Sequence, residues 1–214
     1  MKTFTKFIPV ALALMLSVPA FAETSPTATS TMQINVPEFI NITKESAQEA
    51  STASFNDTYT TITLSPAMNA NFRVITNKPG DQVKLTGTAL GGSTQVNALF
   101  GTVDALNLVF TNTTSTEPPA DTAVSNITGG TPAAKDNANA IAFTLTPTIT
   151  PNTASGATTP GKAFATGIAT YTLNTSGVYD MSYAVGTTAV ANTFSTHDTN
   201  GTYKATITLS QVTP

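Results

Sequence analysis

Cysteine and tryptophan are absent from this chain of 214 residues, and histidine occurs once. Without cysteine the chain has no disulfide, thiol nucleophile or cysteine-ligated zinc, and a single histidine excludes a histidine-rich metal centre. Charged side chains are scarce as well, at 10% of the sequence, whereas an average globular domain has ~25%. This composition argues against an intracellular enzyme and against a nucleic-acid-binding protein.

Long hydrophobic runs are also missing, with one exception at the N-terminus. Residues 7–18 are apolar or small, Lys2 and Lys6 precede them, and residues 19–22 contain an A-x-A pattern. The run is shorter than the ~20 apolar residues that a membrane-spanning helix needs. We therefore predict a cleaved secretory signal peptide over residues 1–22, export to the cell surface or the periplasm, and no membrane span in the mature chain.

Cleavage of this peptide would leave 192 residues, which is 214 minus 22. Because Lys2 and Lys6 leave with it, the 9 basic residues fall to 7 against 12 acidic ones, a net charge of −5. A polar extension follows over residues 23–30. The remaining residues, 31–214, are enough to bury a hydrophobic core without the disulfides that many exported proteins use.

Apolar and polar residues alternate along much of 31–214, and Thr, Val, Ile, Phe and Tyr fill many of the alternating positions. Clusters of Gly, Pro, Asn and Ser separate about eight to ten such runs, which is typical of an all-β chain folded as an antiparallel β-sandwich. The clearest runs are residues 32–36, 72–76, 106–110, 141–145, 164–169, 179–185 and 203–209. The turn at 77–81 predicts a hairpin between 72–76 and 83–85. Residues 45–54 favour one or two helical turns.

Two segments rich in Thr, Pro, Ala and Gly, residues 111–138 and 147–162, predict long loops. Their low apolar content cannot offset the entropy of ordering them. The first segment could separate two small domains, 31–110 and 139–214, but each half has few large apolar residues. We therefore predict one sandwich domain over 31–214 with loop insertions near 111–138 and 147–162.

No set of residues indicates catalysis, a cofactor or a metal. His197 lies in a polar turn, and the sequence has no G-x-S-x-G motif. The acidic residues are scattered singly rather than paired as in a glycosidase, and the glycine pairs lack the Lys and Ser/Thr of a phosphate-binding loop. We predict that the protein is not an enzyme and has no catalytic, cofactor-binding or metal-binding residues.

Three segments share a layout with a known family. Residues 32–37 alternate and precede an Ile-rich stretch, residues 64–72 place Ser65 and Pro66 in a turn before a strand, and residues 201–209 end the chain with another alternating strand. This layout, over about a third of the mature chain, resembles that of cysteine-free fimbrial major subunits assembled by the chaperone/usher route, the colonisation-factor type.

The resemblance implies an incomplete immunoglobulin-like fold whose open groove accepts an N-terminal strand from the next subunit. It also implies self-assembly with like subunits, and a periplasmic chaperone and an outer-membrane usher as partners. The residues concerned are Met32, Ile34 and Val36 for the donated strand, and Tyr203, Ala205, Ile207 and Leu209 for the strand bordering the groove. The alternation of residues 32–36 fits equally well the first strand of a complete sandwich.

The predicted function is therefore that of a secreted structural subunit of a bacterial surface filament, pilus-like and active in surface adhesion. The alternative is a self-contained extracellular or periplasmic binding module, with carbohydrate as one ligand class. Tyr179 and Tyr183 would then be surface aromatic residues, although sugar-binding surfaces usually also present the tryptophan that this chain lacks.

Overall fold

The computed structural model describes residues 30–114, 124 and 139–212. The predicted signal peptide and most of the polar extension lie outside the described residues, as does most of the predicted loop at 111–138. The chain forms two units, Met1–Val36 and Pro37–Pro214. In the first unit the described residues, 30–36, belong to no strand, so the predicted strand at 32–36 is not formed there.

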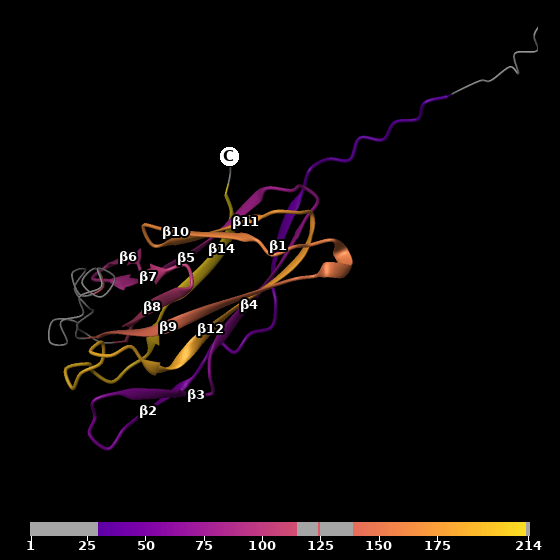
Figure 1. Ribbon diagram of the computed structural model, residues 1–214. Coiled ribbons are helices and arrows are strands. Elements are labelled where there is room, and N and C mark those ends of the chain that lie inside the picture. The colour runs from indigo at the N-terminus through magenta and orange to yellow at the C-terminus, as the bar shows by residue number, and fades with distance from the viewer. Residues whose placement is uncertain (1–29, 115–123, 125–138, 213–214) are drawn as a thin grey trace, which may run out of the picture. The chain divides into compact units, whose positions relative to one another are not determined.

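The second unit is built from two antiparallel β-sheets, which confirms the predicted all-β class (Figure 1). The larger sheet contains, in spatial order, β1 (Ile40–Lys44), β4 (Asn69–Thr76), β12 (Gly177–Ala189), β9 (Ala140–Pro151), β8 (Ala105–Asn112) and β13 (Tyr203–Lys204), with β2 (Thr52–Phe55), β3 (Ile62–Ser65) and β7 (Leu99–Thr102) attached. The smaller sheet contains β10 (Gly161–Ala165), β11 (Ile168–Leu173), β5 (Asp81–Gly91) and β14 (Thr206–Gln211), with β6 (Thr94–Asn97) beside β5. A short 3-10 turn, η1 (Thr153–Ser155), follows β9.

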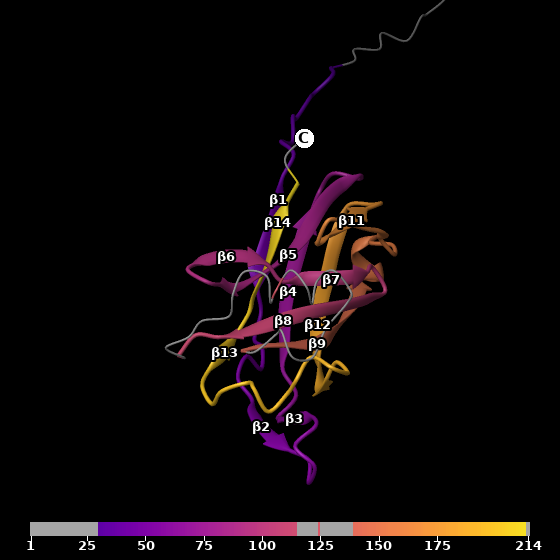
Figure 2. The same ribbon diagram turned by 90° about the vertical axis from the view of Figure 1, so that its left-hand side faces the viewer.

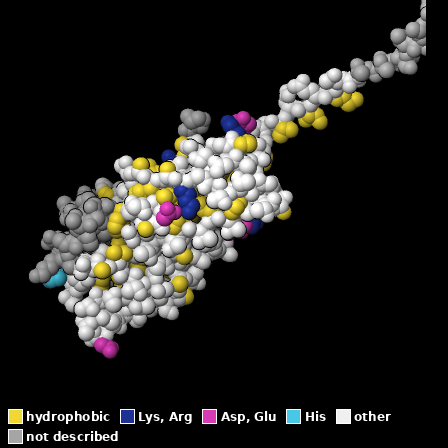
Figure 3. Space-filling model, viewed as in Figure 1, with side chains coloured by type: hydrophobic (Ala, Val, Ile, Leu, Met, Phe, Trp, Pro, Cys, Tyr) yellow, Lys and Arg dark blue, Asp and Glu magenta, His cyan; other side chains and the backbone are white. Residues whose placement is uncertain are grey.

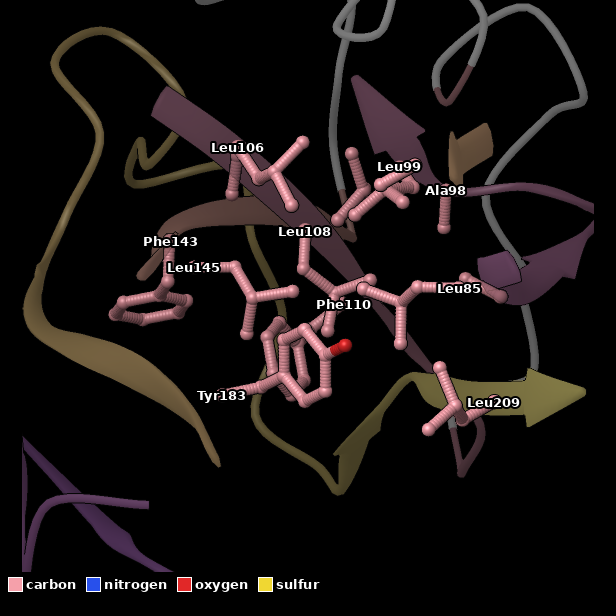
Figure 4. Packing of buried hydrophobic residues seen from close by; sticks show 14 of the residues in the cluster. Leu85, Ala98, Leu99, Leu106, Leu108, Phe110, Phe143, Leu145, Tyr183 and Leu209 are labelled. Atoms are coloured by element: carbon pink, nitrogen blue, oxygen red, sulfur yellow. The ribbon is translucent and has the colours of Figure 1, made fainter. Parts of the chain in front are cut away.

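The core lies between the two sheets, where the alternating residues of each strand meet. β5 buries Val83 and Leu85 completely, and β12 does the same with Tyr179 and Tyr183. Figure 4 shows side chains of the larger sheet, Leu145 among them, gathered against those of the smaller one. Each fully buried side chain of this size stabilises the fold by about 1.5–3 kcal/mol, so this core replaces disulfides as the source of stability.

The predicted hairpin of 72–76 with 83–85 is wrong. The strands at these positions, β4 and β5, lie in different sheets, and each pairs with other strands. The turn between them therefore crosses from one sheet to the other. Both strands bury alternate residues in either arrangement, which is why the sequence pattern does not distinguish a hairpin from a crossover.

The predicted loop at 147–162 is also wrong in part, since residues 147–151 continue β9 and residues 161–162 begin β10. Beyond Leu145, β9 pairs with β12 alone and no longer with β8. An edge position tolerates proline because one side of the strand needs no N–H donor. Pro147 and Pro151 can therefore occupy a strand.

Two smaller predictions also need correction. The alternating run at 164–169 is not one strand, because the backbone turns at Thr166 and Gly167 to form the hairpin of β10 and β11. Residues 45–54 contain no helical turn: 45–51 are irregular, and the rest belongs to β2. Side chains of β4 hold this segment extended, since Asn69 accepts a hydrogen bond from the Gln48 N–H and Asn71 donates one to the Ser46 carbonyl.

Candidate functional site

The main hollow of the second unit is an open groove of about 990 Å³. One wall is formed by residues 44–55, which contain the end of β1 and all of β2, and the other by residues 198–207. Apolar side chains from five strands of the larger sheet and from Met68 and Phe194 form its floor. These residues are Ile62, Leu64, Met68, Phe72, Leu108, Phe110, Ile141, Phe143, Leu145, Tyr183, Val185 and Phe194.

The groove is open because the last strand changes sheets beside it. Tyr203 and Lys204 pair with β8 of the larger sheet, whereas Thr206 and the residues after it pair with β5 of the smaller one. β14 is the final strand of the smaller sheet, so no further strand from the described residues covers the larger sheet beyond it. Inward-facing residues such as Phe72 and Val185 are consequently only partly buried.

The residues predicted to border a groove do face inward from this last strand. Tyr203, Ala205 and Ile207 line the groove. Leu209 is not among the lining residues and lies in the adjoining core, 7% exposed. The alternating pattern therefore predicts that these four side chains share one face of the strand. It does not predict where along the strand the groove ends.

Two strands that reach the groove, β1 and β14, have free edges. β14 hydrogen-bonds to β5 on one side, and β1 hydrogen-bonds to β4 on one side. The two strands lie close together, as both views show (Figures 1 and 2), yet no ladder joins them among the described residues. Their outer N–H and C=O groups are therefore available to an additional strand.

One hydroxyl in the groove wall is buried and unpaired. Ser51 lines the groove between β1 and β2, and its Oγ makes no hydrogen bond to any described residue. A buried hydroxyl without a partner is unfavourable by about 1–3 kcal/mol. A polar group entering the groove could relieve this cost.

A network of polar side chains holds the opposite wall in place. The Asp198 carboxylate accepts hydrogen bonds from the backbone N–H groups of Asn139, at 2.6 Å, and Ser195, at 2.8 Å. The Tyr203 hydroxyl donates to the Thr199 carbonyl at 2.9 Å. Burial of the Asp198 carboxyl raises its pKa to about 6, although the N–H donors and the positive charge of His197 oppose this shift.

The predicted donor residues are exposed apolar side chains of the first unit. Met32, Ile34 and Val36 are 91%, 88% and 73% exposed. Figure 3 shows hydrophobic side chains along the described residues before Pro37. A contiguous group of exposed apolar side chains is a common feature of interaction sites.

The other candidate residues considered from the sequence are a histidine, acidic side chains and aromatic rings. His197 is exposed in its turn, and no group of three or more His, Asp or Glu side chains suited to a metal occurs among residues 30–114, 124 and 139–212. Tyr179 and Tyr183, expected at the surface of a binding module, are fully buried. The exposed aromatic residues of the second unit are Phe39, Phe55 and Tyr59.

Sequence reasoning missed the wall formed by residues 44–55 and the contribution of Phe194. The Ala, Gln and Glu residues of segment 45–54 favour a helix, so the sequence does not predict an extended wall there. The side chains that hold the segment extended belong to β4, more than twenty residues away. Phe194 packs against Phe55 with ring centroids 5.6 Å apart. No local pattern around either phenylalanine indicates this contact.

Comparison with known proteins gives no match: no protein-family model, curated protein or solved structure resembles the chain significantly. Within the described ranges, no helix is long and apolar enough to cross a membrane.

Proposed function

We propose that this protein is an exported structural subunit of a bacterial surface filament, which assembles when residues 32–36 of one copy enter the groove of another. The observation that carries the proposal is the apolar groove beside the free edge of β14. In this proposal the second unit is an incomplete immunoglobulin-like sandwich, and the groove is the place of its missing strand.

The chemistry of the groove supports an extended peptide as its occupant. Backbone groups on the free edge of β14 would supply hydrogen bonds, and alternate side chains of the incoming strand would fill the apolar floor, as in β-strand addition. Met32, Ile34 and Val36 lie on one face of such a strand, while Gln33 and Asn35 would face water. Burying each of the three apolar side chains would stabilise the complex by about 1.5–3 kcal/mol.

The remaining sequence features agree with this assignment. A signal peptide over residues 1–22 would export the chain, and a periplasmic chaperone would cover the groove before an outer-membrane usher adds the subunit to the filament. The surface displayed in Figure 3 carries few charges, so little electrostatic repulsion opposes contact between copies. The protein would act in surface adhesion and would not be an enzyme.

Size and stability measurements on the mature chain, residues 23–214, test the proposal. We expect oligomers whose size grows with concentration, and monomers when Met32, Ile34 and Val36 are all changed to Asn.

A synthetic peptide of residues 30–38 should raise the melting temperature of a chain that begins at Pro37. Gln33→Ala with Asn35→Ala is the matched control on the opposite face. The proposal is wrong if the chain is monomeric with and without residues 23–36 and melts at the same temperature.

A carbohydrate-binding module remains the second candidate, because two exposed aromatic rings lie together at the β2–β3 hairpin. Phe55 is 57% and Tyr59 60% exposed, and their ring centroids are 5.9 Å apart. Stacked C–H groups of a sugar ring bind such surfaces. Saturable binding on a glycan array that is lost in Phe55→Ala and Tyr59→Ala, but kept in the triple Asn variant, would favour this function.

A further inference from the structure

The groove wall of residues 198–207 contains the one Asn–Gly pair of the sequence, Asn200 followed by Gly201. An asparagine before glycine is the asparagine most prone to lose its side-chain amide, because no Cβ on the next residue hinders the approach of its backbone nitrogen to the asparagine Cγ. Asn200 is exposed, so water reaches its amide. The pair therefore combines a reactive sequence with an accessible position.

The fold requires the glycine of this pair. Gly201 has a φ of 154°, which residues with a side chain rarely adopt. A Cβ at this position would overlap the side-chain amide of Asn112 and the hydroxyl of Thr114. A bulkier residue, which would slow the loss of the amide, does not fit here.

The two groups that would react are free of hydrogen bonds. In the described part of the chain, neither the Asn200 side-chain amide nor the Gly201 N–H has a hydrogen-bond partner. Asn192 provides a contrast, because it is exposed as well, but the next N–H belongs to Thr193 and donates to the Val190 carbonyl at 3.1 Å. A paired N–H is held by its acceptor, whereas the Gly201 N–H can turn toward the neighbouring side chain.

We propose that Asn200 is a site of spontaneous deamidation, which converts its amide into a carboxylate in the wall of the groove. The Gly201 nitrogen loses its proton to hydroxide and attacks Asn200 Cγ. The new N–Cγ bond closes a succinimide ring, and the Cγ–Nδ2 bond breaks. Nδ2 takes a proton from water and leaves as ammonia, which restores the hydroxide.

Water then opens the ring at one of its two carbonyls. Opening at the side-chain carbonyl gives aspartate. Opening at the main-chain carbonyl of Asn200 gives isoaspartate, in which the main chain passes through Cγ. The net reaction consumes one water and releases one ammonia, with no oxidation or reduction. It needs no partner and does not depend on what occupies the groove.

The wall is fixed on both sides of the pair, so a longer main chain between these points must displace it. The Thr199 carbonyl accepts a hydrogen bond from Asn112 Nδ2 at 3.2 Å, and the Thr202 N–H donates to Thr114 Oγ1 at 2.9 Å. Asn112 Nδ2 also donates to the Asn200 carbonyl at 3.2 Å. Isoaspartate adds one atom to the main chain and takes that carbonyl out of it. We therefore expect the isoaspartate product to melt at a lower temperature than the unmodified chain.

Peptide mass spectrometry of the mature chain tests the inference. Trypsin cleaves after Lys162 and Lys204, so Asn174, Asn192 and Asn200 fall on a single peptide, whose fragments distinguish them. After incubation at mildly alkaline pH, Asn200 should gain about 1 Da, the difference between an amide and a carboxyl group, while the other two remain unchanged. The reaction should be faster at higher pH, because the attacking nitrogen must lose a proton.

Control variants separate the reaction from its consequence. Asn200→Gln keeps an amide but needs a larger ring for the same attack, so it should show no gain at this position and no fall in melting temperature during the incubation. Asn200→Asp carries the new charge without the longer main chain and should melt above the incubated parent chain.

Incubation in urea measures how the pair reacts without the fold. An amide that persists at Asn200 in the folded chain overturns the inference, whether or not it is lost in urea. Equal gains at Asn192 and Asn200 in the folded chain overturn it as well, because the unpaired N–H would then not select the site. Both results leave the proposed function standing.

Discussion

The two ends of the same sandwich differ in whether the smaller sheet covers the larger one. Around Leu85 and Tyr171 both sheets contribute strands, and these side chains are fully buried. Around Phe72 and Val185 the larger sheet has the same kind of apolar inner face, but no strand formed by residues 30–114 or 139–212 lies over it. Burial therefore depends on the opposite sheet and not on the strand itself, and where the larger sheet is uncovered the same kind of apolar residues line a groove.

The largest effect should follow from a cavity in the closed end. Leu85→Ala removes a fully buried side chain and should lower the free energy of unfolding by about 2–5 kcal/mol. Because Leu85 is not among the residues that line the groove, the loss should be the same with and without the 30–38 peptide. Urea unfolding of the chain from Pro37 onward measures both values. A loss that disappears on adding peptide would show that the two ends are not independent.

A polar change at the open end should act mainly on assembly. Ile207 is partly buried and lines the groove, so Ile207→Asn should cost the free chain less than about 1 kcal/mol. The same change should weaken binding of the 30–38 peptide at least tenfold, as calorimetric titration would measure, because the amide would be desolvated against apolar side chains. Thr208→Asn, on the exposed face of β14, is the matched control and should bind peptide normally. Equal binding by both variants would place the peptide elsewhere.

The two ends also differ in how well the sequence predicts them. In the closed end, alternation alone gives the correct inward residues, such as Val83 and Leu85 in β5 or Tyr179 and Met181 in β12. It does not give the partner of each strand, because β4 and β5 show the same pattern as a hairpin or as a crossover between sheets. Pairing depends on contacts between distant residues that leave no local signal.

In the open end, the sequence predicts one wall and misses the other. Tyr203, Ala205 and Ile207 follow a clear period of two, so their shared face could be recognised. The opposite wall lies in residues 45–51, whose composition favours helix. Bonds from Asn69 and Asn71 outweigh that preference, which is worth only tenths of a kcal/mol per residue. The resemblance to fimbrial subunits remains a prediction that the strand-exchange experiments address.

A smaller effect, dependent on pH, should appear at the wall of the groove. The folded chain raises the pKa of Asp198 to about 6, compared with ~3.9 in an unfolded chain. The folded state then binds the proton more tightly than the unfolded state does. The free energy of unfolding should therefore be higher at pH 5 than at pH 7, and most of the loss should occur as pH rises through 6. Since the carboxyl is partly exposed, we expect a change of about 1 kcal/mol.

Urea unfolding of the chain from Pro37 onward at pH 5, 6 and 7 measures this change. Asp198→Asn should flatten the dependence, whereas Asp57→Asn, an exposed change in the β2–β3 turn, should retain it. His197→Ala separates the contribution of the neighbouring imidazole. An Asp198→Asn chain with the full pH dependence would assign the effect to other groups.

The smallest effect compares two buried hydroxyls, one beside each wall of the groove, that have no hydrogen-bond partner among the described residues. Thr111 Oγ1 lies in β8, opposite Lys204 in the antiparallel register, and Ser51 Oγ lies in the wall formed by residues 44–55. Removing either hydroxyl, by Thr111→Val or Ser51→Ala, should stabilise the free chain by tenths of a kcal/mol to about 1 kcal/mol, since an unsatisfied polar group is lost. Melting temperatures of the chain from Pro37 onward measure both changes.

Adding the 30–38 peptide should separate the two variants. Thr111 follows Phe110, which lines the groove, so the Thr111 side chain lies on the opposite face of β8. Thr111→Val should therefore keep its advantage when peptide is bound. Ser51→Ala should lose its advantage, because the backbone of an inserted strand would supply the partner that the serine hydroxyl lacks. If Ser51→Ala remains stabilising in the complex, the incoming strand does not reach this wall. The groove would then be filled only along β14, with β1 and the segment after it serving to enclose the strand.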